Sequence, residues 1–152
     1  MTGDTYCDGR VCPVAMDVFE DTRGALAKVE LTSCDFHPVR AFIVTAPTGA
    51  VRGGHGHKKG RQLLIRVSGE IEVELFYHGR TQYLKLDATH RAVLIEPPVW
   101  SRQVYLGDNP IMIVFCDTLY DPEDYIWSKD ETELSLECFA ASARLQPKVR
   151  SL

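Results

Sequence analysis

The chain has 152 residues, of which 45% are hydrophobic and 25% are charged, as expected for one soluble globular domain with one core. Its net charge of −4 argues against a general nucleic-acid binder, which would carry a basic surface. No apolar run approaches the ~20 residues that cross a bilayer, and the N-terminus lacks the basic-then-apolar pattern of a signal peptide. We therefore expect a cytoplasmic protein with no membrane or nucleic-acid partner.

Short strands separated by turn residues dominate the pattern along the chain. Residues 1–15 show no clear period and are predicted to form an N-terminal arm. Residues 16–127 are predicted to form one domain. Because glycine and proline recur between its strands, we expect an all-β sandwich or barrel. The predicted strands cover residues 26–31, 39–45, 63–67, 70–75, 83–86, 92–95, 102–106 and 111–116.

Two turn signals divide the middle of the domain. Ser68-Gly69-Glu70 predicts a tight hairpin, and His78-Gly79-Arg80 predicts the next turn. Between them, apolar residues alternate with glutamates over residues 70–75, so that one face of this strand should be buried and the other solvated.

The C-terminal part, residues 128–152, is predicted to form a helix and a tail. Apolar residues repeat at helical spacing over residues 131–145, and Pro147 would end the helix. Such a helix either packs on the outside of the barrel or binds a partner protein.

The most informative segment is Arg52-Gly53-Gly54-His55-Gly56-His57-Lys58-Lys59. In a strand, side chains at positions i and i+2 point to the same face, so His55 and His57 should enter one cavity. Two imidazoles in one cavity form either a metal site or a proton-transfer site.

This segment resembles the first motif of the cupin barrels, in which HxH is followed by an acidic residue. Gln62 holds the acidic place here, and a neutral amide is a poor metal ligand. The second cupin motif commonly offers a further histidine after a tryptophan, where this chain has Ser101. Both differences favour two histidines that work as acid and base, without a metal.

Five segments together resemble the WxcM-like sugar 3,4-ketoisomerases of nucleotide-sugar metabolism, which are cupins. They cover roughly residues 18 to 127, in the order and at the spacing of that family. The segments are Phe19-Glu20-Asp21-Thr22-Arg23-Gly24, residues 36–40, residues 52–59 with Gln62, Pro97-Pro98-Val99-Trp100, and Tyr120-Asp121-Pro122-Glu123-Asp124-Tyr125-Ile126.

The resemblance implies a fold, a ligand and an assembly. The fold is a cupin (jelly-roll) β-barrel, and the ligand is a dTDP-linked keto sugar such as dTDP-4-keto-6-deoxyglucose. The assembly is a homodimer with exchanged N-terminal strands. No metal and no other cofactor is expected.

The implied reaction moves a carbonyl from C4 to C3 of the sugar through an enediol. A base takes the proton from C3 and an acid returns a proton to C4. Histidine suits both steps because its ordinary pKa is about 6.5. We expect His57 to be the base and His55 its partner.

Arginine side chains are the expected phosphate ligands, because a guanidinium group matches two phosphate oxygens at once. Arg40 and Arg52 are the main candidates, and a surface ion pair is the alternative for each. Arg23 is a further candidate, either near the sugar or across the dimer.

Three more residues are candidates for sugar contacts. Gln62 either hydrogen-bonds the sugar or orients a histidine ring, and a plain polar residue on the barrel wall is the alternative. Trp100 either stacks on the ligand or belongs to the core. Ser101 follows it at a place where the family carries a larger polar residue.

The chain also departs from the family near the expected pocket. Phe42 stands where a tyrosine is usual, and the segment from Trp127 onward does not follow the usual ending. These changes leave open a sugar-nucleotide-binding module without activity, or an epimerase of a 4-keto sugar. A metal-dependent cupin such as a dioxygenase is a third alternative.

Overall fold

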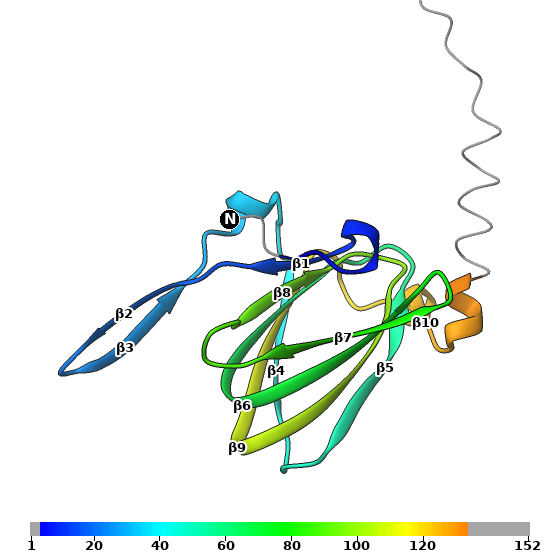
Figure 1. The fold of residues 1–152 in the computed structure, drawn as a ribbon. Coiled ribbons are helices and arrows are strands. Elements are labelled where there is room, and N and C mark those ends of the chain that lie inside the picture. Colours follow the sequence, from blue (N-terminus) through cyan, green and yellow to red (C-terminus); the bar gives the residue numbers. More distant parts are fainter. Residues whose placement is uncertain (1–3, 134–152) are drawn as a thin grey trace, which may run out of the picture.

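A computed structural model describes residues 4–133 of the chain. An antiparallel sheet that curls on itself dominates it, and three short 3-10 helices lie outside the sheet (Figure 1). The helices are η1 (Cys7–Gly9), η2 (Leu31–Cys34) and η3 (Pro122–Asp124). The strands are β1 (Val11–Val14), β2 (Asp17–Asp21), β3 (Gly24–Lys28), β4 (Arg40–Thr45), β5 (Val51–His57), β6 (Gln62–Tyr77), β7 (Arg80–Leu86), β8 (Ala92–Ile95), β9 (Trp100–Cys116) and β10 (Tyr125–Ile126).

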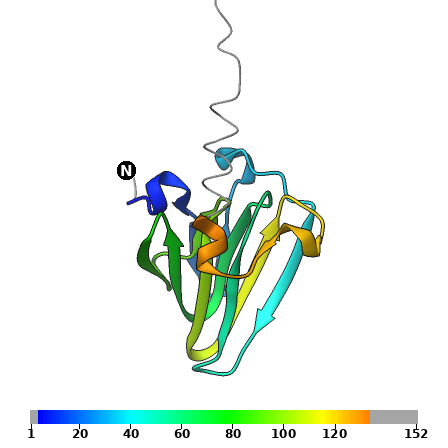
Figure 2. The ribbon, with the colours of Figure 1, turned by 90° about the vertical axis from the view of Figure 1, so that its right-hand side faces the viewer.

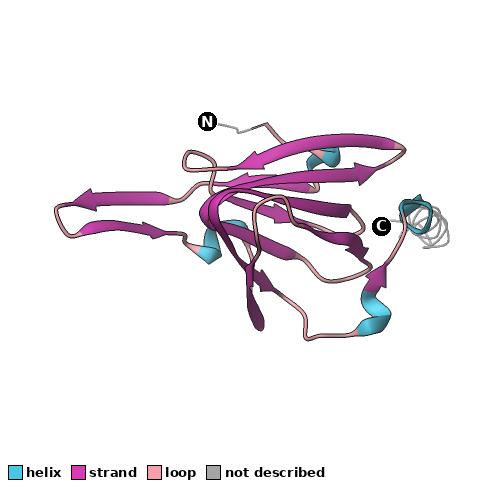
Figure 3. Cartoon of the chain, turned by 90° about the horizontal axis from the view of Figure 1, so that it is seen from below, coloured by secondary structure: helices cyan, strands magenta, loops and turns pink. Residues whose placement is uncertain are grey.

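Two long strands, β6 and β9, organise the sheet. They pair with each other from Gln62↔Cys116 to Phe76↔Trp100, and every other strand of the large sheet is built outward from them. The order is β1-β8-β6-β9-β5-β10, with β4 also on β9 and β7 also on β6. Seen from the side and from below, the strands wrap around a common interior (Figures 2 and 3). The predicted all-β, cupin-like fold is confirmed.

The predicted hairpin at residues 68–70 is wrong. β6 continues through Gly69, and irregularities in its pairing with β9 bend it at this point. Gly69 has φ +68°, and a Cβ atom there would lie 2.6 Å from Cα of Pro110, so only glycine fits. A glycine with positive φ serves a β-bulge as well as a turn, and here it bends a continuous strand around the barrel.

The predicted turn at residues 78–80 is confirmed. β6 ends at Tyr77 and β7 starts at Arg80, and the two intervening residues have φ values of +50° and +67°. Two positive φ values are those of a type I′ turn, whose twist matches that of the flanking strands.

Alternating side chains from the long strands fill the barrel interior. Ile71, Val73 and Leu75 are buried as predicted. Glu74, predicted to be solvated, is buried too, because Arg102 and Lys129 cover it and bind its carboxylate. The remaining buried hydrophobic residues of this core include Leu64, Leu84, Leu86, Val93, Tyr105, Met112 and Val114.

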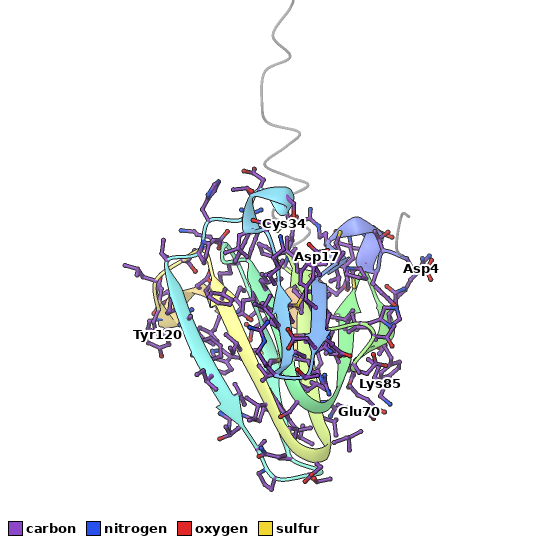
Figure 4. The ribbon with its side chains drawn as sticks, turned by 90° about the vertical axis from the view of Figure 1, so that its left-hand side faces the viewer. Asp4, Asp17, Cys34, Glu70, Lys85 and Tyr120 are labelled. Carbon is purple, nitrogen blue, oxygen red and sulfur yellow. The ribbon has the colours of Figure 1, made fainter. Side chains whose placement is uncertain are left out.

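The first residues of the chain join the sheet. The sequence pattern predicts no strand before residue 16, but β1 pairs with β8 in the register Val11↔Ile95 to Val14↔Ala92. Next comes the hairpin of β2 and β3, where the sequence predicts a single strand over residues 26–31. This hairpin projects away from the barrel, and every one of its strand residues is exposed (Figure 1). Figure 4 views the molecule from the hairpin side, with Asp17 of β2 in front of the sheet.

A short helical segment, residues 129–133, closes the described part of the chain. Lys129 anchors it by lying over the rings of Trp100 and Phe76, at 4.8 and 5.2 Å, and by donating to Glu74 at 2.7 Å. The predicted helix over residues 131–145 lies mostly outside the described residues. Within residues 4–133, no helix has the length and apolar character needed to cross a membrane.

Candidate active site

A cavity of about 240 Å³ opens into the barrel between β4, β5, β6 and β9. It combines polar and apolar side chains, as small-molecule sites do. Its lining residues are Phe42, Ile43, Val44, Arg52, Gly53, His55, Gln62, Leu64, Gln103, Tyr105, Met112, Val114 and Tyr125.

The two histidines lie together at one end of β5. Their ring centroids are 5.2 Å apart, with the rings nearly perpendicular. His55 lines the cavity, whereas His57 is only 8% exposed and lies behind it. Both rings also border a second void of about 10 Å³, together with Gln62 and Ser101. That volume is about the size of one water molecule.

A buried carboxylate holds the second histidine. Nδ1 of His57 lies 3.0 Å from Oδ2 of Asp124. The same carboxylate accepts hydrogen bonds from the backbone N–H groups of Lys59, at 2.7 Å, and Gly60, at 3.3 Å. A neutral His57 therefore donates through Nδ1, which leaves the lone pair of Nε2 available to take a proton. Nε2 is buried and has no hydrogen-bond partner among the described residues.

An aromatic stack closes the site on the β10 side. Tyr125 pairs with His57 across β5 and β10, and its ring centroid lies 4.8 Å from those of both His55 and His57. Trp127 stacks on Tyr125 at 5.0 Å and is 63% exposed. The histidines are thereby shielded from water on this side.

Burial sets the protonation of both histidines. It lowers the pKa of His55, and the neighbouring His57 lowers it further, against the opposing hydrogen bond to the backbone of Gly53. Burial also lowers the pKa of His57, more than the hydrogen bond to Asp124 raises it. Both imidazoles are therefore neutral at pH 7 and able to accept a proton.

The structure brings most of the sequence-predicted site residues to this region. Arg52 and Gln62 line the cavity, and Ser101 borders the small void beside the histidines. Arg40 lies close enough for its charge to lower the pKa of His57. Its guanidinium group lies over the rings of Phe42 and Tyr120, each at 5.8 Å.

Two predicted site residues lie elsewhere in the structure. Trp100 is on the face of β9 opposite to Ser101, buried beneath Lys129. Arg23 lies at the tip of the projecting hairpin with an 88% exposed side chain, paired with Asp21. Neither lines the cavity.

The sequence interpretation missed four residues of the site. Asp124 and Tyr125 belong to residues 120–126, a segment that resembles the family but carries no predicted site residue. Gln103 and Tyr105 lie in a predicted strand, where their alternation with Ser101 was the available signal.

The described residues contain no group of three or more histidine, cysteine, aspartate and glutamate side chains arranged to hold a metal ion. Beside the two histidines, the carboxylate of Asp124 is already bound by Nδ1 of His57 and by two backbone N–H groups, so only the two imidazoles remain as donors. The donor set thus fits proton transfer better than metal ligation.

Comparison with known proteins agrees with this chemistry. Residues 11–135 match the model of the family described as FdtA: WxcM-like, C-terminal. The TDP-4-oxo-6-deoxy-alpha-D-glucose-3,4-oxoisomerase of Aneurinibacillus thermoaerophilus is 30% identical over 112 residues, which are 72% of this chain and 81% of that protein.

Two solved structures share the fold. One is a variant of the 3,4-ketoisomerase QdtA from Thermoanaerobacterium thermosaccharolyticum in complex with TDP-4-keto-6-deoxyglucose. Its TM-score is 0.77 at 23% identity, covering 86% of this chain and 96% of QdtA. The other is a 3,4-ketoisomerase from Helicobacter canadensis, with a TM-score of 0.73 at 22% identity, covering 83% and 96%. From the family match and the curated relative together, the chain belongs to the FdtA (WxcM-like) family.

Proposed function

We propose that this protein is a sugar 3,4-ketoisomerase acting on a dTDP-linked 4-keto-6-deoxyhexose. The observation that carries the proposal is the pair of neutral histidines beside a cavity, His55 half-buried and His57 buried and held by a carboxylate. The relatives' activity on TDP-linked keto sugars supplies the substrate class.

The reaction needs no external oxidant or reductant. A histidine takes the proton from C3, and the C3–H electron pair becomes the C3–C4 double bond. The former carbonyl oxygen at C4 takes up a proton, which completes the enediol. A proton is then returned to C4 while the hydroxyl at C3 loses its own, so that the carbonyl ends on C3. Proton transfer of this kind is the chemistry of general acid–base catalysis.

The geometry favours the opposite division of roles from the one expected from the sequence. His55 lines the cavity that would hold the sugar, whereas His57 is buried and does not line it. We therefore assign the exchange at carbon to His55. His57 receives and returns protons through Nε2, because Asp124 keeps its Nδ1 as the donor.

Arg52 and Arg40 are the proposed diphosphate ligands. Arg52 lines the cavity and is itself exposed, so it lies at the rim. Arg40 is half-buried against two aromatic rings, and its Nε donates to the carbonyl of Thr118 at 3.3 Å. The other guanidinium N–H groups of Arg40 are suited to phosphate oxygens. Gln62 and Ser101 are proposed to contact the sugar.

The proposed assembly is a homodimer that exchanges N-terminal strands. The projecting hairpin supports this proposal because Val18, Phe19 and Leu26 are exposed on it. An isolated two-stranded hairpin is marginally stable, so these side chains call for a surface to cover them. Arg23, at the hairpin tip, would then reach the partner subunit rather than its own cavity. Size measurement by sedimentation or light scattering tests this assembly.

The test of function is to incubate the protein with dTDP-4-keto-6-deoxyglucose in D2O and to follow the sugar by NMR. A 3-keto product with deuterium at C4 is expected, and His55→Asn and His57→Asn should each abolish it. Exchange at C3 without a 3-keto product would replace the proposal with an epimerase. Ligand binding without exchange would replace it with a binding module.

A further inference from the structure

Two buried polar side chains on β9 have no role in the proton transfer proposed above. Gln103 is 8% exposed and Tyr105 is 0% exposed, and both line the cavity. They share one face of the strand with Ser101, because side chains at i and i+2 point the same way. Together they form a polar wall along the cavity.

Both side chains are weakly bonded for buried polar groups. The hydroxyl of Tyr105 contacts Sδ of Met112 at 4.0 Å, and residues 4–133 offer it no other hydrogen-bond acceptor. Nε2 of Gln103 donates to Oγ of Ser101 at 3.4 Å, near the upper limit for a hydrogen bond. Buried polar groups are normally well bonded, so these two retain capacity for a ligand in the cavity.

The surrounding chain makes room for this wall. Gly53, on β5, has φ +78°, and a Cβ atom there would lie 2.8 Å from Oε1 of Gln103. Arg52 pairs with Gln103 across the two strands, which places the amide next to the proposed phosphate ligand. Burial raises the pKa of Tyr105 to about 12, so its hydroxyl keeps its proton and remains a donor.

The size and polarity of the cavity indicate which part of the ligand it takes. Its volume of about 240 Å³ is below the roughly 300–1,000 Å³ of pockets that enclose whole drug-sized ligands. It therefore fits the sugar ring alone. The apolar residues Phe42, Leu64 and Val114 line the same cavity and suit a sugar with one methyl group in place of a hydroxyl.

We infer that Gln103 and Tyr105 bind the 6-deoxyhexose ring and select it through hydrogen bonds to its oxygen atoms. The inference rests on the proposed function and adds the specificity-determining residues. Phe42 on β4 stands where the family usually has a tyrosine, and it has no hydroxyl. The Tyr105 hydroxyl on β9 would supply a hydrogen-bond donor in its place.

Tyr105→Phe is the decisive variant, because it removes one oxygen and keeps the ring in place. Its KM for dTDP-4-keto-6-deoxyglucose should rise about tenfold, the usual effect of one hydrogen bond in a water-excluded site. Its affinity for TDP, measured by calorimetry, should not change. Its melting temperature should also stay constant, since the sole hydrogen-bond partner of the hydroxyl among residues 4–133 is the thioether of Met112. Gln103→Leu should behave in the same way.

Tyr83→Phe, on the exposed face of β7, is the matched control and should match the parent protein. If the parent protein turns over the keto sugar and Tyr105→Phe has the same KM, the inference is overturned and the function stands. Equal weakening of TDP and of keto sugar, with a lower melting temperature, would also overturn it in favour of a structural role. A parent protein that neither binds TDP nor converts the keto sugar would instead contradict the proposed function.

Discussion

Replacement of Asp124 by asparagine is the sharpest test of how the histidine pair is held. The carboxylate accepts from Nδ1 of His57 at 3.0 Å and from two backbone N–H groups, those of Lys59 at 2.7 Å and Gly60 at 3.3 Å. An asparagine in the same position offers one acceptor oxygen, and its amide nitrogen faces a group that was a donor. At least one buried donor therefore loses its acceptor.

The expected loss follows from that geometry. A buried donor without an acceptor costs about 1–3 kcal/mol of unfolding free energy. For a domain of this size, that loss lowers the melting temperature by roughly 2–12 °C. If the amide donates to Nδ1, His57 changes tautomer and Nε2 can no longer accept a proton. The turnover number should then fall by about 10²-fold or more, the contribution of a positioned acid–base group.

Thermal unfolding and steady-state isomerisation measure the two effects separately. Asp121→Asn is the control, because Asp121 caps η3 from an exposed position three residues earlier, and asparagine caps a helix equally well. A drop in turnover without a change in KM is expected for Asp124→Asn alone. Unchanged turnover in Asp124→Asn would refute the assigned role of the carboxylate, whatever happened to stability.

Three further predictions follow from the same structure. His55 has a lowered pKa in the folded state, so the unfolded chain binds the additional proton first, and stability should fall as pH drops below about 6.5. Urea unfolding at pH 7 and pH 5 should show a smaller loss for His55→Gln than for the parent, and an equal loss would contradict burial as the cause. Gly53→Ala should lower the unfolding free energy, measured in urea, by about 1–3 kcal/mol. Alanine would be strained at the positive φ of this position, and its methyl group would meet the side chain of Gln103. Unchanged stability would exclude that contact. Glu74→Ala should cost only about 1 kcal/mol, because Arg102 and Lys129 are partly exposed and solvent screens their charges. It should also release Lys129, detected as faster proteolysis after that residue, and unchanged digestion would show that the carboxylate does not anchor the segment.

The strands were predictable wherever local pattern decides the outcome. Alternation over residues 70–75 and the turn at residues 78–80 need only neighbouring residues, and the burial of Ile71 and the turn at Gly79 are as predicted. Glu74 is the exception, because Arg102 and Lys129, which cover it, are distant in sequence. The bend at Gly69 was not predictable in the same way. Whether such a glycine reverses a strand or bends it depends on the partner strand, here on Pro110 of β9.

The residues of the site were likewise predictable only where a local pattern determines their position. His55 and His57 share a face because they are two residues apart, which the sequence states directly. Asp124 reaches His57 across 67 residues of chain, through the pairing of β5 with β10. That contact depends on the fold, and a local sequence pattern cannot predict a carboxylate so distant in sequence.

The alternation of side chains along β9 makes the cavity wall and the anchor of residues 129–133 two sides of one strand. Ser101 faces the cavity region, whereas Trp100 and Arg102 hold Lys129 and Glu74 on the other side. Insertion or deletion of a single residue here would exchange the two sides and remove both functions at once. We therefore expect single-residue insertions in this segment to be more damaging than single substitutions. A scan that compares the activity and stability of both kinds of variant would measure the difference.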